Sequence, residues 1–416
     1  MKENIDEENQ ILYINKKEKE NTEIKKENKK RNKKILDLKE EKKIRNSSFE
    51  ILRIILMIFI AMSHIIFHTK SLPKLDDKNY TKIINKNYIF LRIISNYGKL
   101  GDILFIMISG YFSIKKLNFH YIKFILISSE TYFYHYIFLF LSFKLKDKYK
   151  EIELLKQNKG SFYFPLTNNL GHWFTQNYLL LLIFMPYINT SLLSLNHEKY
   201  KALVILIIIF YCIFRGIFSI YQIVSIIFNA SHLIKLILPY IIGGYIRLFD
   251  LEYKKFWKIF GILCFLLTII FEIIFDNLAI KYNNYIFIIC QNELSLNINS
   301  ILLFFCSMGV ICLFKDIQIY NKFINFISAS VLGIYLIHAN KNISPFIYNA
   351  WYKTNDYNEE NFFIRYFSKV FLIFIVCLII DIIRRYTIEL LIVNIITFLE
   401  NTFKHRAKYE IKESIA

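Results

Sequence analysis

An arginine and a histidine in the first apolar segment have the types and spacing best suited to chemistry. Arg53 and His64 are eleven positions apart in LRIILMIFIAMSH. On an α-helix this spacing leaves ~20° between the two side chains and ~16 Å along the axis. A guanidinium can hold phosphate through parallel hydrogen bonds, whereas an imidazole can take a hydroxyl proton near neutral pH or carry an acyl group itself. The pair therefore predicts an anion site and a base on one helix face at different depths.

Each of the two residues also has a structural explanation. An arginine close to the end of a membrane helix can anchor the helix by extending its head group to the interface. A histidine inside a membrane can simply hydrogen-bond a neighbouring helix. Because both residues lie on one face of one segment, we favour a joint functional role for Arg53 and His64.

Four further residues are expected at the same, outer end of the protein as His64, where they would contact a substrate. His172 and Trp173 open the segment HWFTQNYLLLL, and Tyr335 and His338 lie in the segment LGIYLIHAN. Tyr335 and His338 are three positions apart and therefore share a helix face. A belt of aromatic rings at the membrane interface is the alternative for Trp173.

The segment KLGDILFIMISGYFSIKK adds an acid and a glycine. Asp102 can orient a histidine at the outer end, which makes it a substrate-binding candidate, or it can cap its helix. Gly110, near the inner end, permits close helix packing or a close backbone approach. The other ionisable residues in apolar segments are interpreted as structural ion pairs or interface positions: Glu130, Arg215, Glu272, Asp381, Arg384 and Arg385.

The composition indicates an integral membrane protein. Of the 416 residues, 55% are hydrophobic and 17% aromatic, with only 5 prolines, which is too apolar for a soluble chain with long loops. The net charge of +19 comes from tails and connections without a basic, aromatic-rich face, so no nucleic-acid partner is expected. The six cysteines form no CxxC pair or Cys/His cluster, and no metal site is expected. No Walker-type loop or internal repeat is visible.

Apolar periodicity predicts an all-α, polytopic transmembrane bundle of about ten spans with both termini in the cytoplasm. We expect residues 1–46 to form a charged, disordered cytoplasmic tail, 47–397 the membrane domain, and 398–416 a cytoplasmic C-terminal tail. The predicted spans are Ile51–Phe67, Leu100–Ile114, Tyr121–Phe143, Trp173–Leu193, Ala202–Tyr221, Leu233–Phe249, Phe256–Phe275, Ile298–Phe314, Phe323–Ile337 and Val370–Leu391. The second and ninth are shorter than the ~20 residues of a perpendicular span, so tilt or flanking residues must extend them.

These residues resemble landmarks of the acyltransferase 3 family, the integral membrane O-acyltransferases of bacterial surface glycans and related lipids. The family carries an Arg in its first span followed eleven positions later by a His, which matches Arg53 and His64. Segments similar to LFIMISGYF with its basic turn, to HWFTQNYLLL and to GIYLIH follow in the family's order. The resemblance covers roughly residues 49–393.

The resemblance implies a multi-pass O-acyltransferase of a bacterial plasma membrane. It would move an acetyl or another short acyl group from cytoplasmic acyl-CoA to a surface or lipid-linked glycan, with no bound cofactor. His64 would be the catalytic histidine, assisted by Arg53, and the donor would contact Arg53 and the turn residues Lys115 and Lys116. Many relatives have arginines in this turn, and an acid where Ala339 follows GIYLIH. Because no extracytoplasmic domain follows the last predicted span, we expect the protein to act alone or with a separate extracytoplasmic partner.

A transporter, flippase or polymerase of lipid-linked glycans is the principal alternative, and a structural membrane subunit is a further one. A transporter needs polar residues along its pathway but no acyl-CoA, and many transporters contain repeated halves. The pairing of Arg53 with His64 favours the acyltransferase.

Overall fold

All regular elements in the described part of the chain are helices, as predicted. The computed structural model describes residues 46–69, 86–145, 172–214, 232–251, 253–282, 284, 286–291, 293–294, 298, 300–344, 346–350 and 360–415. The predicted N-terminal tail lies outside these residues except for Asn46, and so does Arg215. Residues Ser47–Ala416 form one compact unit.

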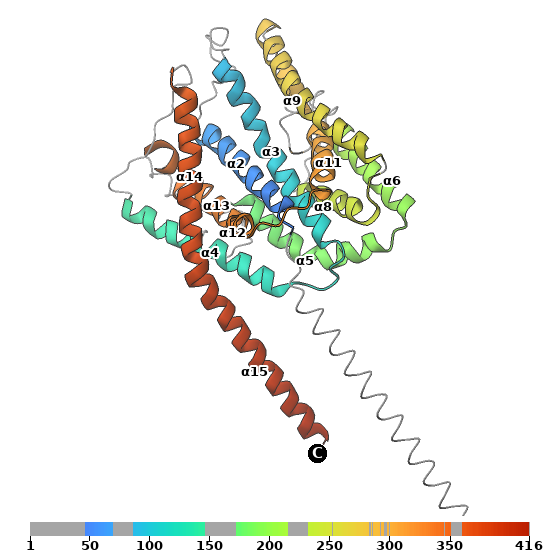
Figure 1. Ribbon diagram of the computed structural model, residues 1–416, viewed down its shortest axis with the longest axis vertical. Helices are drawn as coiled ribbons and strands as arrows, with labels where there is room; N and C mark the ends of the chain where they lie inside the picture. Colours follow the sequence, from blue (N-terminus) through green and yellow to red (C-terminus); the bar gives the residue numbers. More distant parts are fainter. Residues whose placement is uncertain are drawn as a thin grey trace, which may run out of the picture. The chain divides into compact units, whose positions relative to one another are not determined.

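Figure 1 shows the helices in chain order. They are α2 (Ser48–Thr69), α3 (Lys86–Ser113), α4 (Tyr121–Leu145), α5 (Trp173–Leu193), α6 (His197–Ile207), α8 (His232–Phe249), α9 (Lys254–Tyr282), α10 (Ile286–Gln291), α11 (Ile301–Lys315), α12 (Lys322–Ser328), α13 (Val331–His338), α14 (Phe362–Arg384) and α15 (Leu390–Ile415). Among the described residues, π-helical turns include η5 (Ile208–Phe214), η7 (Phe346–Ala350) and η8 (Arg385–Glu389).

Five stretches of these helices are long and apolar enough to cross a membrane. They are Ser48–His68, Tyr121–Ser142, His232–Phe249, Lys254–Ala279 and Phe362–Thr402, and each overlaps a predicted span. Two shorter apolar stretches, Ile301–Lys315 and Lys322–His338, overlap the eighth and ninth predicted spans. The chain is therefore a multi-pass membrane protein, while the count of ten spans and the orientation of the termini stay predictions.

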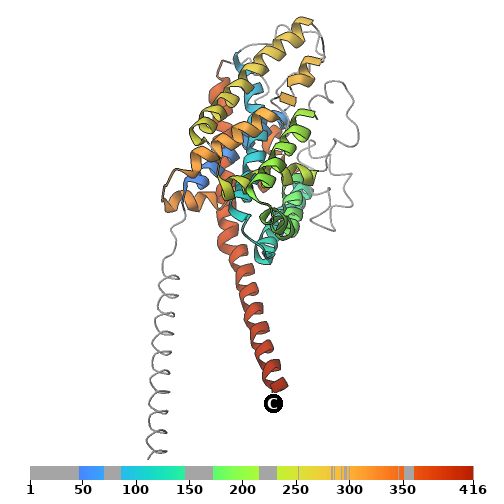
Figure 2. The same cartoon turned by 90° about the vertical axis from the view of Figure 1, so that its right-hand side faces the viewer.

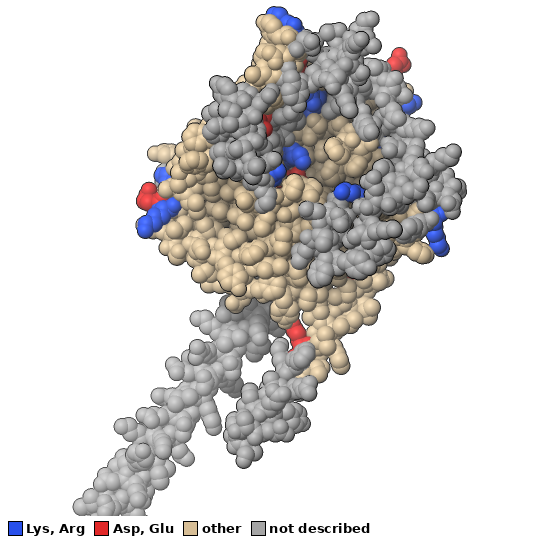
Figure 3. All heavy atoms as spheres, turned by 180° about the vertical axis from the view of Figure 1, so that it is seen from behind, with Lys and Arg blue, Asp and Glu red and all other residues tan. Residues whose placement is uncertain are grey.

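The lipid-facing surface is visible along α9. Ile259, Ile262, Leu266 and Ile270 recur every three or four residues and are each between 47% and 61% exposed, which places an apolar stripe on one side of the helix. Exposing such a stripe to water would cost free energy, whereas exposing it to the hydrocarbon of a membrane would not. On the face shown in Figure 3, most of the described surface is uncharged, and Lys and Arg side chains lie near the rim and within a hollow.

Helix α3 packs against several neighbours and is nearly twice as long as the predicted span Leu100–Ile114 that it overlaps. Its 28 residues extend ~42 Å, because residues 86–99 precede the predicted span within the same helix. Close approach is possible because glycines face the partner helices: a Cβ on Gly110 would lie 2.1 Å from the backbone oxygen of Tyr240 in α8, and one on Gly243 of α8 would lie 2.0 Å from that of Met107. Small residues at such crossings let helix backbones touch.

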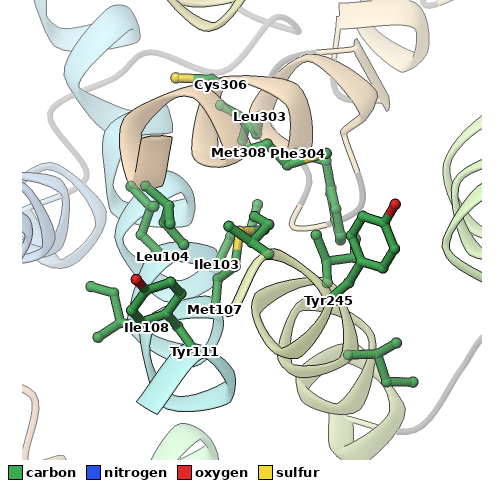
Figure 4. Close-up of a cluster of buried hydrophobic side chains, with 14 of the residues drawn as sticks. Ile103, Leu104, Met107, Ile108, Tyr111, Tyr245, Leu303, Phe304, Cys306 and Met308 are labelled. Carbon is green, nitrogen blue, oxygen red and sulfur yellow. The ribbon is translucent and has the colours of Figure 1, made fainter. Parts of the chain in front are cut away.

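The largest buried apolar cluster forms around this crossing (Figure 4). Ile103, Leu104 and Met107 of α3 are fully buried against Leu303 and Phe304 of α11. The cluster therefore holds α3, α8 and α11 together and fixes the helix that carries the SGYF segment.

The predicted ninth span is interrupted at Ala329 and Ser330, which separate α12 from α13. A break inside a membrane protein frees backbone groups that require partners. Arg385 provides one: its Nη1 donates to the carbonyl oxygen of Phe326 at 3.2 Å and to the Ser330 hydroxyl at 3.1 Å. A side chain at the start of η8 therefore provides hydrogen bonds at the interruption.

A buried ion network joins α4 to the last helices. Arg384 binds Asp381 at 2.8 Å, Glu130 at 3.0 Å and Glu389 at 2.9 Å, and the Tyr134 hydroxyl donates to Asp381 at 2.8 Å. These contacts supply the partners that the sequence could not assign. Beyond them, α14, η8 and α15 run on as one long helical stretch (Figure 2), so helix continues through residue 415 in the predicted C-terminal tail.

Candidate active site

The start of α2 is tied to the loop and helix that precede α13. The Ser47 amide donates to the carbonyl oxygen of Ile319 at 2.6 Å, and its hydroxyl donates to that of Asn321 at 3.2 Å. One turn later, Glu50 accepts a hydrogen bond from Ser328 at the end of α12. Because α12 leads directly into α13, these bonds fix the helix that carries Arg53 and His64 relative to the helix that carries His338.

The structure brings the three candidate histidines together around one tyrosine ring. The His64 ring centroid lies 5.1 Å from that of His338 and 6.2 Å from that of Tyr335. The Tyr335 ring is in turn 5.9 Å from His172 and 6.1 Å from His338. We call His64, His172, His338 and Tyr335 the histidine cluster; its members come from α2, α13 and the residue preceding α5.

Ring nitrogens in this cluster lack hydrogen-bond partners among the described residues. His338 Nδ1 donates to the carbonyl oxygen of Ile334 at 2.6 Å, which leaves Nε2 as a buried acceptor with no partner. His172 Nε2 lies 3.3 Å from the Asn340 amide nitrogen, and its buried Nδ1 has no partner; the same holds for Nδ1 of His64. Buried polar atoms are normally paired, so the cluster is suited to a ligand that can both donate and accept.

A cation and an acid adjoin the histidine cluster. The Lys99 ammonium lies 3.6 Å from the Asp102 carboxylate and 5.8 Å from the centroid of the Trp173 ring. The charge of Lys99 interacts with the His64 ring, and the charge of Asp102 interacts with Tyr335. The candidates Asp102 and Trp173 therefore lie beside the cluster, linked through a lysine that the sequence had not singled out.

A second histidine on α2 closes one side of the cluster. His68 lies one turn after His64, with ring centroids 5.9 Å apart, and its ring stacks on Tyr348 at 4.8 Å and 6°. The Lys369 ammonium donates to the Tyr348 carbonyl oxygen at 2.8 Å. His68 is thus held by packing, whereas His64 faces the other histidines.

Arg53 is held by an acid one turn earlier on α2. Its Nη1 lies 2.6 Å from Glu50, its guanidinium carbon is 5.9 Å from the centroid of the Phe112 ring, and its side chain remains 22% exposed. The ion pair preorganises the guanidinium on the side of the helix that faces the SGYF segment. Arg53 therefore keeps donors for a further anion, although Glu50 offsets part of its charge.

Basic side chains gather around a tyrosine of α5 near Arg53. The Lys123 ammonium donates to the Tyr178 hydroxyl at 2.6 Å, and Ser109 lies 3.4 Å from the same hydroxyl. Arg53 and Lys116 are both within electrostatic range of Tyr178. We call Arg53, Lys116, Lys123 and Tyr178 the basic cluster.

The turn after α3 is fixed by a buried asparagine. The Asn189 amide nitrogen donates to the carbonyl oxygens of Ser113 at 2.8 Å and Lys116 at 2.7 Å, while its oxygen accepts from the Tyr240 hydroxyl at 2.8 Å. Lys115 and Lys116 keep exposed side chains. The backbone of the turn is thus fixed by hydrogen bonds, while the exposed side chains of Lys115 and Lys116 can contact a ligand.

Several residues of these clusters were missed by sequence reasoning. His68 carries a signal that was available, because it follows His64 by four positions on the same helix. Lys99 and Lys123 look like ordinary membrane-edge lysines in the sequence. Asn340 and Tyr178 acquire their roles only through partners far away in the chain. Within the described ranges, no group of three His, Cys, Asp or Glu side chains is arranged to hold a metal ion.

These features define a class: a multi-pass helical membrane protein in which one helix joins a basic cluster to a buried histidine cluster. The acyltransferase domain model of the acyltransferase 3 family matches residues 46–382, so the chain belongs to that family and is a membrane acyltransferase. The match includes every residue of the two clusters. No curated protein and no solved structure matches the chain significantly.

Proposed function

We propose that the protein is an O-acyltransferase that moves an acetyl or similarly short acyl group from cytoplasmic acyl-CoA to a hydroxyl of a surface or lipid-linked glycan in a bacterial plasma membrane. The observation that carries this proposal is the position of His64: it shares a helix face with Arg53, and its ring lies 5.1 Å from that of His338, whose Nε2 is a buried acceptor without a described partner. The His64 imidazole can remove the proton of the reacting hydroxyl, while His338 Nε2 can accept a hydrogen bond from a neighbouring hydroxyl of the same glycan.

On the donor side, three cations support binding of the phosphates of coenzyme A. Arg53 can form parallel hydrogen bonds to a phosphate, whereas Lys116 and Lys123 act as point charges. Glu50 is the carboxylate in contact with Arg53, so the basic cluster keeps a net positive charge. Lys115 lies one residue from Lys116 with an exposed side chain, and we assign it to the same task.

On the acceptor side, the histidine cluster supports general base catalysis. The neutral His64 imidazole takes the proton of the acceptor hydroxyl as its oxygen attacks the thioester carbonyl. The new C–O bond forms, the C–S bond breaks, and the thiolate leaves with the proton that the imidazolium returns. In the covalent variant, the imidazole nitrogen attacks first and the acyl group passes from it to the hydroxyl.

The other members of the acceptor side would hold the sugar. Hydrogen bonds to the sugar would come from His172, Tyr335 and His338, and the Asp102 carboxylate would accept another. The Trp173 ring would provide a flat apolar surface for the sugar to pack against. The acceptor reaches this site directly or through a separate extracytoplasmic partner that receives the acyl group.

Inside-out membrane vesicles test the proposal, because they expose the cytoplasmic face to added donor. Vesicles with and without the protein are given acetyl-CoA carrying a radioactive acetyl group, and alkali-labile label in the glycan and lipid fractions is counted. We expect label that depends on the protein and on unmodified Arg53. Transport or flipping of lipid-linked sugars without incorporated label would contradict the proposal and favour a transporter.

A further inference from the structure

We propose that Phe174 limits the size of the acyl group that the protein transfers. This inference rests on the proposed function, since it concerns the passage of the acyl group between the basic cluster and the histidine cluster. Phe174 is the residue whose ring lies between the two.

A row of aromatic rings connects the two clusters. The Phe174 ring is parallel to that of Tyr178, at 6.3 Å and 10°, and meets that of Tyr335 at 6.0 Å and 64°. The Tyr335 ring lies 6.2 Å from His64. A thioester with its phosphates at Arg53 and its carbonyl at His64 would lie along this row of rings, with Phe174 at the middle.

Both neighbours of Phe174 are fixed. Tyr178 is held by the Lys123 ammonium at 2.6 Å, and Tyr335 is fully enclosed, at 6% exposure, among the histidine rings. Phe174 itself packs against two separate apolar clusters of the core, as does Leu332. Because well-packed interiors yield little, the ring cannot move far aside for a larger group.

The chemistry of this position suits selection by size. Tyr178 and Tyr335 carry hydroxyls that can hydrogen-bond a carbonyl or water, whereas Phe174 presents only apolar surface. A short acyl group can pass along such a ring, whereas each added methylene of a longer acyl group would clash with it. One methylene in an apolar site typically changes kcat/KM by ~10- to 200-fold.

An apolar cavity of about 200 Å³ offers the rival location for an acyl chain. It lies between α2, α3, α9 and α11, and its lining includes Leu52, Ile55 and Phe59. Phe59 is six positions from Arg53 and so points ~120° away from it around α2. The cavity therefore lies off the helix face that joins Arg53 to His64, and we do not assign it to the route.

The test uses inside-out vesicles that contain the full-length protein with its native acceptor. Acetyl-, propionyl- and butyryl-CoA, each labelled in the acyl group, are supplied separately, and the kcat/KM for alkali-labile incorporation is measured for each donor. Phe174→Ala is compared with Phe174→Leu, which retains more of the packing. Two matched controls remove a phenylalanine elsewhere: Phe184→Ala on the same helix, where Phe184 is 47% exposed, and Phe59→Ala in the apolar cavity.

We expect Phe174→Ala to raise the ratio of butyryl to acetyl transfer by at least ~10-fold, Phe174→Leu to raise it less, and both controls to leave it unchanged. An unchanged ratio in active Phe174→Ala and Phe174→Leu vesicles would overturn the inference while leaving the proposed function intact. A rise in Phe59→Ala instead would assign selection to the cavity and would also overturn it. If the wild-type protein incorporates no acyl group at all, the proposed function fails first.

Discussion

Gly110→Ala tests how the helix crossing supports the donor side. The added Cβ would lie 2.1 Å from the backbone oxygen of Tyr240, whereas ordinary contact begins at 3.4 Å. Helices α3 and α8 would have to separate by about 1.3 Å at this point, because the obstructing atom belongs to backbone that cannot rotate away. Overpacking of this kind costs ~1–3 kcal/mol.

The displacement should also affect the basic turn. Tyr240 holds Asn189, and Asn189 holds the backbone of the turn that carries Lys116. We therefore expect Gly110→Ala to lower the melting temperature of the detergent-solubilised protein and to raise the KM for acetyl-CoA.

The control for this substitution is Gly244→Ala in α8. There the added Cβ would meet side-chain atoms rather than backbone: the Tyr200 hydroxyl at 2.8 Å and a carbon of Ile114 at 2.9 Å. Gly244→Ala should destabilise the protein less than Gly110→Ala. Equal melting temperatures for Gly110→Ala and wild type would refute the argument that this backbone contact is obligatory.

Three further substitutions address charged groups. Arg384→Met leaves three carboxylates around a vacated buried centre and should cost ~3–5 kcal/mol, seen as a lower melting temperature in detergent. Arg53→Lys loses parallel phosphate hydrogen bonds and should raise the KM for acetyl-CoA more than it lowers stability; equal KM values would make Arg53 an anchor. Lys258→Ala removes a hydrogen bond that holds the pKa of the exposed Asp316 carboxyl below its usual range. The stabilisation that Lys258 provides should be below ~1 kcal/mol. It is fully present above the unfolded-state pKa of an aspartate, ~4, and is lost as the pH falls through the lower folded-state pKa of Asp316. Melting curves of the wild type and Lys258→Ala should therefore differ more at pH 7 than at pH 3.

Periodic features were the ones that the sequence predicted well. Apolar runs identified the five helices now seen to be long enough to cross a membrane. Helix arithmetic placed Arg53 and His64 on one face, and the predicted grouping of His64 with His172 and His338 is reproduced by the ring contacts, while its outer position in the membrane stays a prediction. Such predictions need only local geometry, because the side-chain direction of a helix repeats every 3.6 residues.

Features that depend on distant partners escaped prediction. The break between α12 and α13 carries no proline or glycine at Ala329 and Ser330, and its freed carbonyl is satisfied by Arg385 more than fifty positions away. Asn340 reaches His172 across 168 positions. The polar first half of α3 was excluded from the predicted span because its charges interrupt the apolar run, although Arg92 is paired there with Asp276 of α9 at 2.9 Å.

The catalytic assignment of His64 is the central claim, and one substitution tests it most directly. His64→Gln retains a hydrogen-bonding side chain but cannot accept the acceptor proton, so acyl transfer per inserted molecule should fall by at least ~100-fold. His68→Gln, one turn away, removes a ring that packs on Tyr348 and should lower stability more than it lowers turnover. Membrane abundance and melting temperature are measured in parallel for both variants. A well-inserted His64→Gln protein that transfers acetyl groups at nearly the wild-type rate would contradict the account.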